Sequence, residues 1–121
     1  ANNWTLDDHV TEFSDCFYQD GKGDADLLVA NIAFAEALAA RGLTGADLGV
    51  GQLWPRSGAP AGTDNPVSFK WVTGYPKLSA YANYTHIWWN EGLTNEWNAL
   101  YGDIVSCDAG RVYQSQVMNT P

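Results

Sequence analysis

The chain has 121 residues and a formal net charge of -8, because it holds 14 acidic residues and only six basic ones. This charge repels polyanions, so we expect no nucleic-acid partner and no attraction to an anionic membrane surface. No run of about 20 apolar residues occurs, which predicts no membrane insertion. The length is typical of one domain, and we expect residues 1–121 to form a single globular unit.

The only two cysteines are Cys16 and Cys107. A single cysteine pair, few lysines, many tryptophans and tyrosines, and a first residue other than Met together favour an exported protein. We therefore predict a Cys16–Cys107 disulfide and a secreted, periplasmic or cell-surface location. Two buried thiols are the alternative. Two cysteines and two distant histidines do not compose a metal site, and no haem-attachment motif is present, so we expect no metal and no other cofactor.

The first predicted element is a helix over residues 5–18. Its apolar residues Leu6, Val10, Phe13 and Phe17 follow one another at steps of four, three and four, which is typical of one side of a helix. Cys16 lies beside this row, so the disulfide would connect this helix to the far end of the chain.

The second predicted helix covers residues 24–41. Asp24 can cap its first turn, its alanines favour helix, and Gly42 is placed to end it. An apolar side of this helix should pack inward. Together with the first helix and a following strand, it gives the residues that we expect to be mostly buried: Phe13, Phe17, Leu28, Ile32, Leu38, Phe69 and Trp71.

The middle of the chain is rich in glycine and proline from residue 49 to residue 66, which predicts a loop. Alternating apolar and polar residues then predict a strand over 67–73 and a last strand over 111–118, with a helix over 95–102 between them. Residues 85–89 fit a further strand, although the whole segment 76–90 can instead be helical.

These elements predict an α+β fold, with N-terminal helices packed on a small antiparallel sheet and a single disulfide. A mainly helical fold is the alternative, because it follows if segment 76–90 is helical.

The stretch from residue 81 to residue 101 concentrates aromatic side chains and is the best candidate for a functional surface. If 85–89 is a strand, Trp88 and Trp89 point to opposite faces, so one of them is available to a partner together with Tyr84. Tyr84, Trp88 and Trp89 are therefore the candidate ligand-binding residues. We predict an exported, non-enzymatic module that binds a glycan or a protein, or that assembles with copies of itself.

The alternative is a small secreted hydrolase of glycoside-hydrolase or nuclease type. Its catalytic candidates are His86, Glu91 and Glu96, since a histidine or a pair of carboxylates can act as acid and base. The set His86, Gly92, Asn95 and Asn98 is similar to the His–Asn core of HNH nucleases, but the further metal-holding residues of that family are absent. The sequence therefore assigns no family, and whether the chain is an enzyme stays open.

Overall fold

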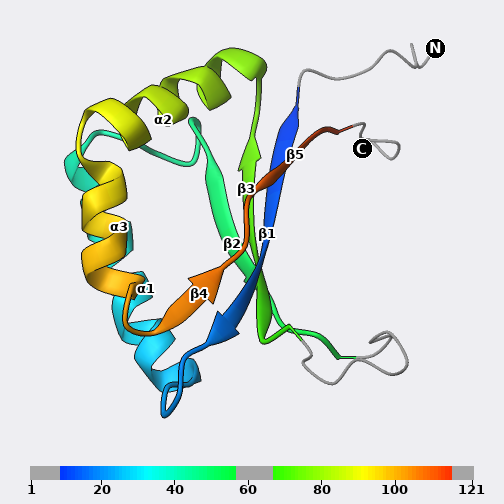
Figure 1. The fold of residues 1–121 in the computed structure, drawn as a ribbon. Coiled ribbons are helices and arrows are strands. Elements are labelled where there is room, and N and C mark those ends of the chain that lie inside the picture. The colour runs from blue at the N-terminus through cyan, green and yellow to red at the C-terminus, as the bar shows by residue number, and fades with distance from the viewer. Residues whose placement is uncertain (1–8, 57–66, 116–121) are drawn as a thin grey trace.

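The computed structural model describes residues 9–56 and 67–115. Within these residues, three helices pack on one face of a five-stranded antiparallel sheet (Figure 1). The predicted α+β class with a single disulfide is therefore confirmed. The elements, in chain order, are β1 (Val10–Tyr18), α1 (Asp24–Ala40), β2 (Gly49–Leu53), β3 (Phe69–Tyr75), α2 (Leu78–Asn90), α3 (Leu93–Tyr101), β4 (Val105–Cys107) and β5 (Arg111–Gln114).

Strand β1 is the centre of the sheet, whose order is β2-β3-β1-β4. It pairs with β3 along one side, where Val10 lies opposite Tyr75 and Cys16 opposite Phe69. The other side of β1 is shared, because β4 pairs with its C-terminal end and β5 with its N-terminal end. The C-terminal part of the chain thus returns to β1. Both β4 and β5 make their backbone hydrogen bonds to β1.

The helix predicted over residues 5–18 is wrong, because residues 10–18 form β1 and residues 5–8 lie outside the described residues. The helical spacing of Val10, Phe13 and Phe17 arises from a strand that is apolar on both faces. Val10 and Cys16 are buried on the face that the helices cover, whereas Phe13 lies on the opposite face and contacts Tyr113. Apolar positions taken from two faces of a strand can imitate one side of a helix.

The helix predicted over 24–41 is confirmed as α1. Gly42 follows the end of this helix with φ +72°, a conformation that glycine adopts readily. The cap differs from the prediction. Gly23 is the N-cap residue, and its backbone N–H donates to the Asp26 carboxylate at 3.0 Å. Asp24 instead begins the first turn and accepts a hydrogen bond from the Tyr18 hydroxyl.

The inward side of α1 consists of Leu27, Ala30 and Phe34, all of them buried. Leu28 and Ile32 are 55% and 66% exposed, so their predicted burial is wrong. The helix is apolar on nearly every side, and its sequence therefore does not mark the side that meets the sheet. Of the other residues expected in the core, Phe69 is fully buried, while Leu38, Trp71, Phe13 and Phe17 are partly buried.

The strand predicted over 67–73 is confirmed as β3, and the helix predicted over 95–102 is confirmed as α3. The strand predicted over 85–89 is wrong, because α2 covers this segment, as the helical alternative for 76–90 proposed. In the segment predicted as a loop over 49–66, residues 49–53 form the edge strand β2, and residues 57–66 lie outside the described residues.

The last predicted strand, over 111–118, is confirmed for residues 111–114 as β5, whereas residues 116–118 lie outside the described residues. None of the described helices is long and apolar enough to cross a membrane.

The predicted disulfide is confirmed. Cys16 and Cys107 are direct neighbours on the antiparallel strands β1 and β4, and their α-carbons are 4.1 Å apart. The bond joins positions that are 91 residues apart and fixes the short strand β4 beside the centre of the sheet. A disulfide is compatible with an extracellular location.

Removing this disulfide should destabilise the protein, because the bond restricts a long loop in the unfolded chain. We expect the double variant Cys16→Ala/Cys107→Ala to lose about 2–5 kcal/mol in free energy of unfolding. Urea denaturation of wild type and variant measures the difference. A loss below about 1 kcal/mol, or two free thiols by mass spectrometry in protein purified without reductant, would contradict this account.

The two sides of α1 should respond differently to truncation. Leu27→Ala removes a fully buried side chain and should cost about 2–5 kcal/mol. Ile32→Ala, on the exposed side of the same helix, should change the free energy of unfolding by less than about 1 kcal/mol. Equal losses in the two variants would mean that α1 faces the sheet with a different side.

Candidate functional site

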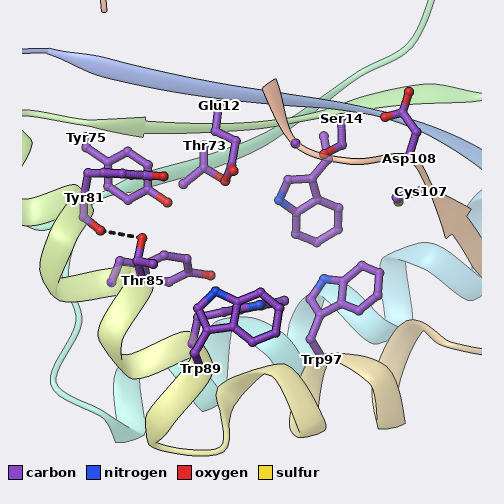
Figure 2. A pocket seen from close by; sticks show the side chains of 14 residues that line it. Glu12, Ser14, Thr73, Tyr75, Tyr81, Thr85, Trp89, Trp97, Cys107 and Asp108 are labelled. Atoms are coloured by element: carbon purple, nitrogen blue, oxygen red, sulfur yellow. Dashed lines mark hydrogen bonds between the residues drawn. The ribbon is translucent and has the colours of Figure 1, made fainter. Parts of the chain in front are cut away.

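A pocket of about 390 Å³ lies between the helix-covered face of the sheet and the helices α2 and α3 (Figure 2). This volume is near the lower end of the range for small-molecule sites. We call it the aromatic pocket, because half of its lining residues are tryptophans and tyrosines. It is lined by Glu12, Ser14, Trp71, Thr73, Tyr75, Tyr81, Tyr84, Thr85, Trp88, Trp89, Trp97, Cys107, Asp108 and Gly110.

Helix α2 provides the largest share of the pocket wall. Tyr81, Tyr84, Thr85 and Trp88 follow at the spacing that places side chains on one side of a helix, and that side faces the sheet. The Thr85 hydroxyl donates to the Tyr81 carbonyl at 2.9 Å, so Thr85 satisfies its polar group within the helix. Trp89 is the next residue, is 68% exposed, and therefore lies where the pocket meets solvent.

Trp71 forms the part of the wall that belongs to the sheet. It is one of the alternate residues of β3 that point toward the helices. Its ring centroid lies 5.9 Å from that of Trp97 and 5.1 Å from that of Tyr101, both on α3. Trp97 in turn contacts Trp88 of α2, with centroids 6.1 Å apart. Edge-to-face contacts of this kind connect the sheet to both helices and fix the wall of the pocket.

Tyrosines continue the wall toward the other end of α2. Tyr75 contacts Tyr81 and Tyr84 with ring centroids 5.2 and 5.7 Å apart, and Tyr84 contacts Trp88 at 6.2 Å. Burial is the main cause that raises the pKa of Tyr75 and of Tyr84, so both hydroxyls stay protonated at neutral pH. Tyr75 is only 2% exposed, and its hydroxyl has no hydrogen-bond partner among the described residues.

Glu12 is a carboxylate inside this aromatic environment. It lies on β1 directly opposite Thr73, and in Figure 2 its side chain extends from the sheet toward α2. Partial burial raises the pKa of Glu12. No hydrogen bond or ion pair to another described residue compensates the carboxylate for its lost hydration. Gly110 leaves room for this carboxylate, since a β-carbon at that position would come within 2.5 Å of Oε2.

Asp108 provides a second carboxylate at the exposed edge of the pocket. It accepts a hydrogen bond from the Asp15 backbone N–H at 2.7 Å and pairs with Arg111 at 2.9 Å. These interactions, the backbone hydrogen bond first, lower the pKa of Asp108. Arg111 is not among the residues that line the pocket, and the described lining contains no lysine, arginine or histidine.

The three residues predicted to bind a ligand, Tyr84, Trp88 and Trp89, all line the aromatic pocket. They do so from one helix, so the prediction that Trp88 and Trp89 lie on opposite faces of a strand is wrong. Glu12 was missed because the expected N-terminal helix concealed it. The alternation of Val10, Glu12, Ser14 and Cys16 was the signal that could have placed it on the inward face.

The structure does not bring the three catalytic candidates together in the pocket. His86 is exposed on α2, where its Nδ1 lies 3.2 Å from the Asn90 side-chain nitrogen. Glu96 forms an ion pair with Arg41 at 2.5 Å, and Glu91 is exposed in the turn between α2 and α3. None of them lines the aromatic pocket. In the part of the chain that is described, no three His, Cys, Asp or Glu side chains lie together as metal ligands would.

Comparison with known proteins gives a likeness at the level of fold. No protein-family model and no curated protein sequence matches this chain. Among solved structures, it is similar to a dimeric protein of unknown function and ferredoxin-like fold from Bacteroides fragilis NCTC 9343. The identity is 11% and the TM-score 0.50, over 92% of this chain and 100% of that one. The chain has a ferredoxin-like fold.

Two further structures share this fold. SnoaB, a cofactor-independent oxygenase from Streptomyces nogalater, is 13% identical with a TM-score of 0.52, over 92% of this chain and 96% of its own. An uncharacterized NIPSNAP-like domain protein from Burkholderia xenovorans is 10% identical with a TM-score of 0.54, over 94% of this chain and 90% of its own. At these identities the likeness establishes architecture only, and the function has to be argued from the pocket.

Glu12 should make stability depend on pH. Its raised pKa means that the folded protein holds the Glu12 proton more tightly than the unfolded chain. This contribution is fully present below the unfolded pKa and is lost as pH rises through the folded pKa. Glu12→Gln should therefore raise the thermal midpoint at pH 7 and change it little below the ordinary pKa of glutamate. A lower midpoint at pH 7 would show that the ionised carboxylate stabilises the fold.

Proposed function

We propose that the chain is an exported, non-enzymatic binding module whose ligand occupies the aromatic pocket. The observation that carries this proposal is the unbroken series of ring contacts from Tyr81 through Tyr75, Tyr84, Trp88 and Trp97 to Trp71 around an accessible volume. Rings held by one another are preorganised, so a ligand loses little affinity to the ordering of side chains. The disulfide supports a location outside the cytoplasm, either secreted, periplasmic or on the cell surface.

The size of the pocket favours a small ligand or a single group of a larger one. A glycan fits this description through one ring stacked on Trp88 or Trp89, with hydroxyls reaching the polar groups of Glu12 and Thr73. A protein partner or a second copy of this chain would find a different apolar surface on α1, where Leu28 and Ile32 are exposed.

A second candidate is catalysis in the same pocket, and one observation favours it. Glu12 is a carboxyl group with a raised pKa in an apolar site, which is the state that a general acid or base requires. A hydrolase of this kind would use Glu12 instead of His86, Glu91 or Glu96, because these three lie outside the pocket. Turnover that Glu12→Gln abolishes, with ligand binding retained, would support this candidate over the binding module.

The binding proposal predicts that Trp89→Ala loses affinity without unfolding. Trp89 is largely exposed, so its removal should leave the thermal midpoint within a few degrees of wild type. A nucleobase stacked on one aromatic ring gains about 1–3 kcal/mol. If stacking of the ligand on Trp89 contributes about 1 kcal/mol, its removal lowers the affinity about fivefold. Calorimetric titration with a panel of mono- and oligosaccharides, small amines and their neutral analogues measures the affinity.

The matched control is Trp54→Ala, which removes a tryptophan that is 40% exposed and does not line the aromatic pocket. It should bind like wild type. If no member of the panel binds wild type, or if Trp54→Ala weakens binding as much as Trp89→Ala does, the pocket is not the ligand site.

A further inference from the structure

We propose that the ligand of the aromatic pocket is a small alkylammonium ion, held with its positive charge among the tryptophan rings and beside the Glu12 carboxylate. This inference rests on the proposed function and adds the chemical class of the ligand.

The charge of the pocket lining favours a cation. Glu12 and Asp108 are the ionisable acids in it, and no lysine, arginine or histidine of the described lining opposes them. Asp108 is already paired with Arg111. Glu12 has neither an ion pair nor a hydrogen bond among the described residues, although it is partly buried. A carboxylate withdrawn from water gains most from a bound cation, since the cation replaces the missing counter-charge.

The aromatic walls of the pocket also favour a cation. An aromatic ring carries negative charge on its face, and tryptophan attracts cations more strongly than tyrosine or phenylalanine does. Four tryptophans line this pocket: Trp71, Trp88, Trp89 and Trp97. Trp88 and Trp89 lie with ring planes at 90° to each other, so a cation near both meets differently oriented rings. Methyl groups around a quaternary nitrogen would fill apolar space that a bare metal ion could not.

The buried hydroxyl of Tyr75 is a further polar group that a ligand can satisfy. It lines the pocket, its residue is 2% exposed, and it has no hydrogen-bond partner in the described part of the chain. A buried polar group without a partner is costly, so it favours a ligand that offers one. Glu12 and Tyr75 line the same pocket, so one ligand can reach both groups. A ligand with an ammonium group and a hydroxyl satisfies both.

The net charge of -8 supports the same ligand class, because it attracts cations toward the molecule from a distance. A phosphate beside the ammonium group would work against this attraction and would approach Asp108 at the edge of the pocket. The structure therefore favours a free alkylammonium compound over a phosphocholine headgroup.

Choline and 3,3-dimethylbutan-1-ol form the decisive pair of probes. They have the same shape and the same hydroxyl, but only choline carries a positive charge. We expect choline to bind wild-type protein at least about tenfold more tightly by calorimetry, since cation–π attraction and the Glu12 counter-charge act on choline alone. Phosphocholine should bind more weakly than choline. Raising the salt concentration should weaken the binding of choline more than the binding of its neutral analogue.

The Glu12→Gln variant tests the role of the carboxylate without changing the size of the side chain. This variant should lower the affinity for choline by about tenfold and leave the affinity for 3,3-dimethylbutan-1-ol unchanged. Glu36→Gln removes the same charge from an exposed position on α1 that does not line the pocket, so it should bind choline like wild type. Circular dichroism of both variants confirms that they are folded.

The outcomes separate this inference from the proposed function. Equal affinity for choline and its neutral analogue, or choline binding that Glu12→Gln does not weaken, overturns the alkylammonium assignment while the pocket remains a ligand site. Phosphocholine binding more tightly than choline overturns the preference for a free cation. Saccharide binding without choline binding overturns the inference alone, and the absence of binding by every probe overturns the proposed function with it.

Discussion

The packing of Trp71 against two helices is the interaction on which the arrangement of this molecule depends. Trp71 points inward from β3 and contacts Phe34 of α1 at 5.9 Å, as well as Trp97 and Tyr101 of α3. One side chain thus connects the sheet to the first helix and to the last. Because α3 also carries the contact to Trp88, the position of α2 over the sheet follows from the same cluster. The pocket is the space that this packing leaves beside Trp71.

The pocket combines a rigid apolar wall with a carboxylate, that of Glu12, that has no hydrogen-bond or ion-pair partner among the described residues. Fold stability alone does not favour this combination, since an apolar residue at position 12 would avoid the desolvation of a carboxylate. Local arrangements that oppose stability are typical of functional sites. Glu12 and the Tyr75 hydroxyl, which has no hydrogen-bond partner in the described part of the chain, are two such arrangements in one pocket, and a single ligand with complementary groups would relieve both.

The sequence predicted much of this structure where one periodicity dominates. Helix α1, strand β3 and helix α3 have clear patterns, and the two cysteines allow only one pairing. Residues 10–18 were mistaken for a helix because β1 is apolar on both faces, as a central strand can be. Helix α2 was ambiguous because Thr85, Ile87 and Trp88 favour strands, whereas the tertiary contacts of the segment, such as those of Tyr81 and Tyr84 with Tyr75 of β3, are made by a helix.

Only part of the candidate site could be predicted from the sequence. Tyr84, Trp88 and Trp89 were found from composition alone, since aromatic density does not depend on the type of element. The period of a strand can place Glu12 on the inward face of β1, but its position beside Trp71 and Tyr75 follows only from the pairing of β1 with β3, which brings together residues about 60 positions apart. The sequence contains no local pattern for such a pairing. His86, Glu91 and Glu96 were grouped by closeness in the chain, but they lie on α2, in the following turn and on α3, and none of them lines the pocket.

The most direct test of this account is an NMR titration that follows the indole N–H signals of the six tryptophans. The ligand is whichever probe among choline, 3,3-dimethylbutan-1-ol and the saccharides binds most tightly by calorimetry. The account predicts that the signals of Trp71, Trp88, Trp89 and Trp97 shift together and that the signal of Trp54 does not. Shifts that exclude these four signals, or that appear equally at Trp54, would contradict the claim that the aromatic pocket is the binding site.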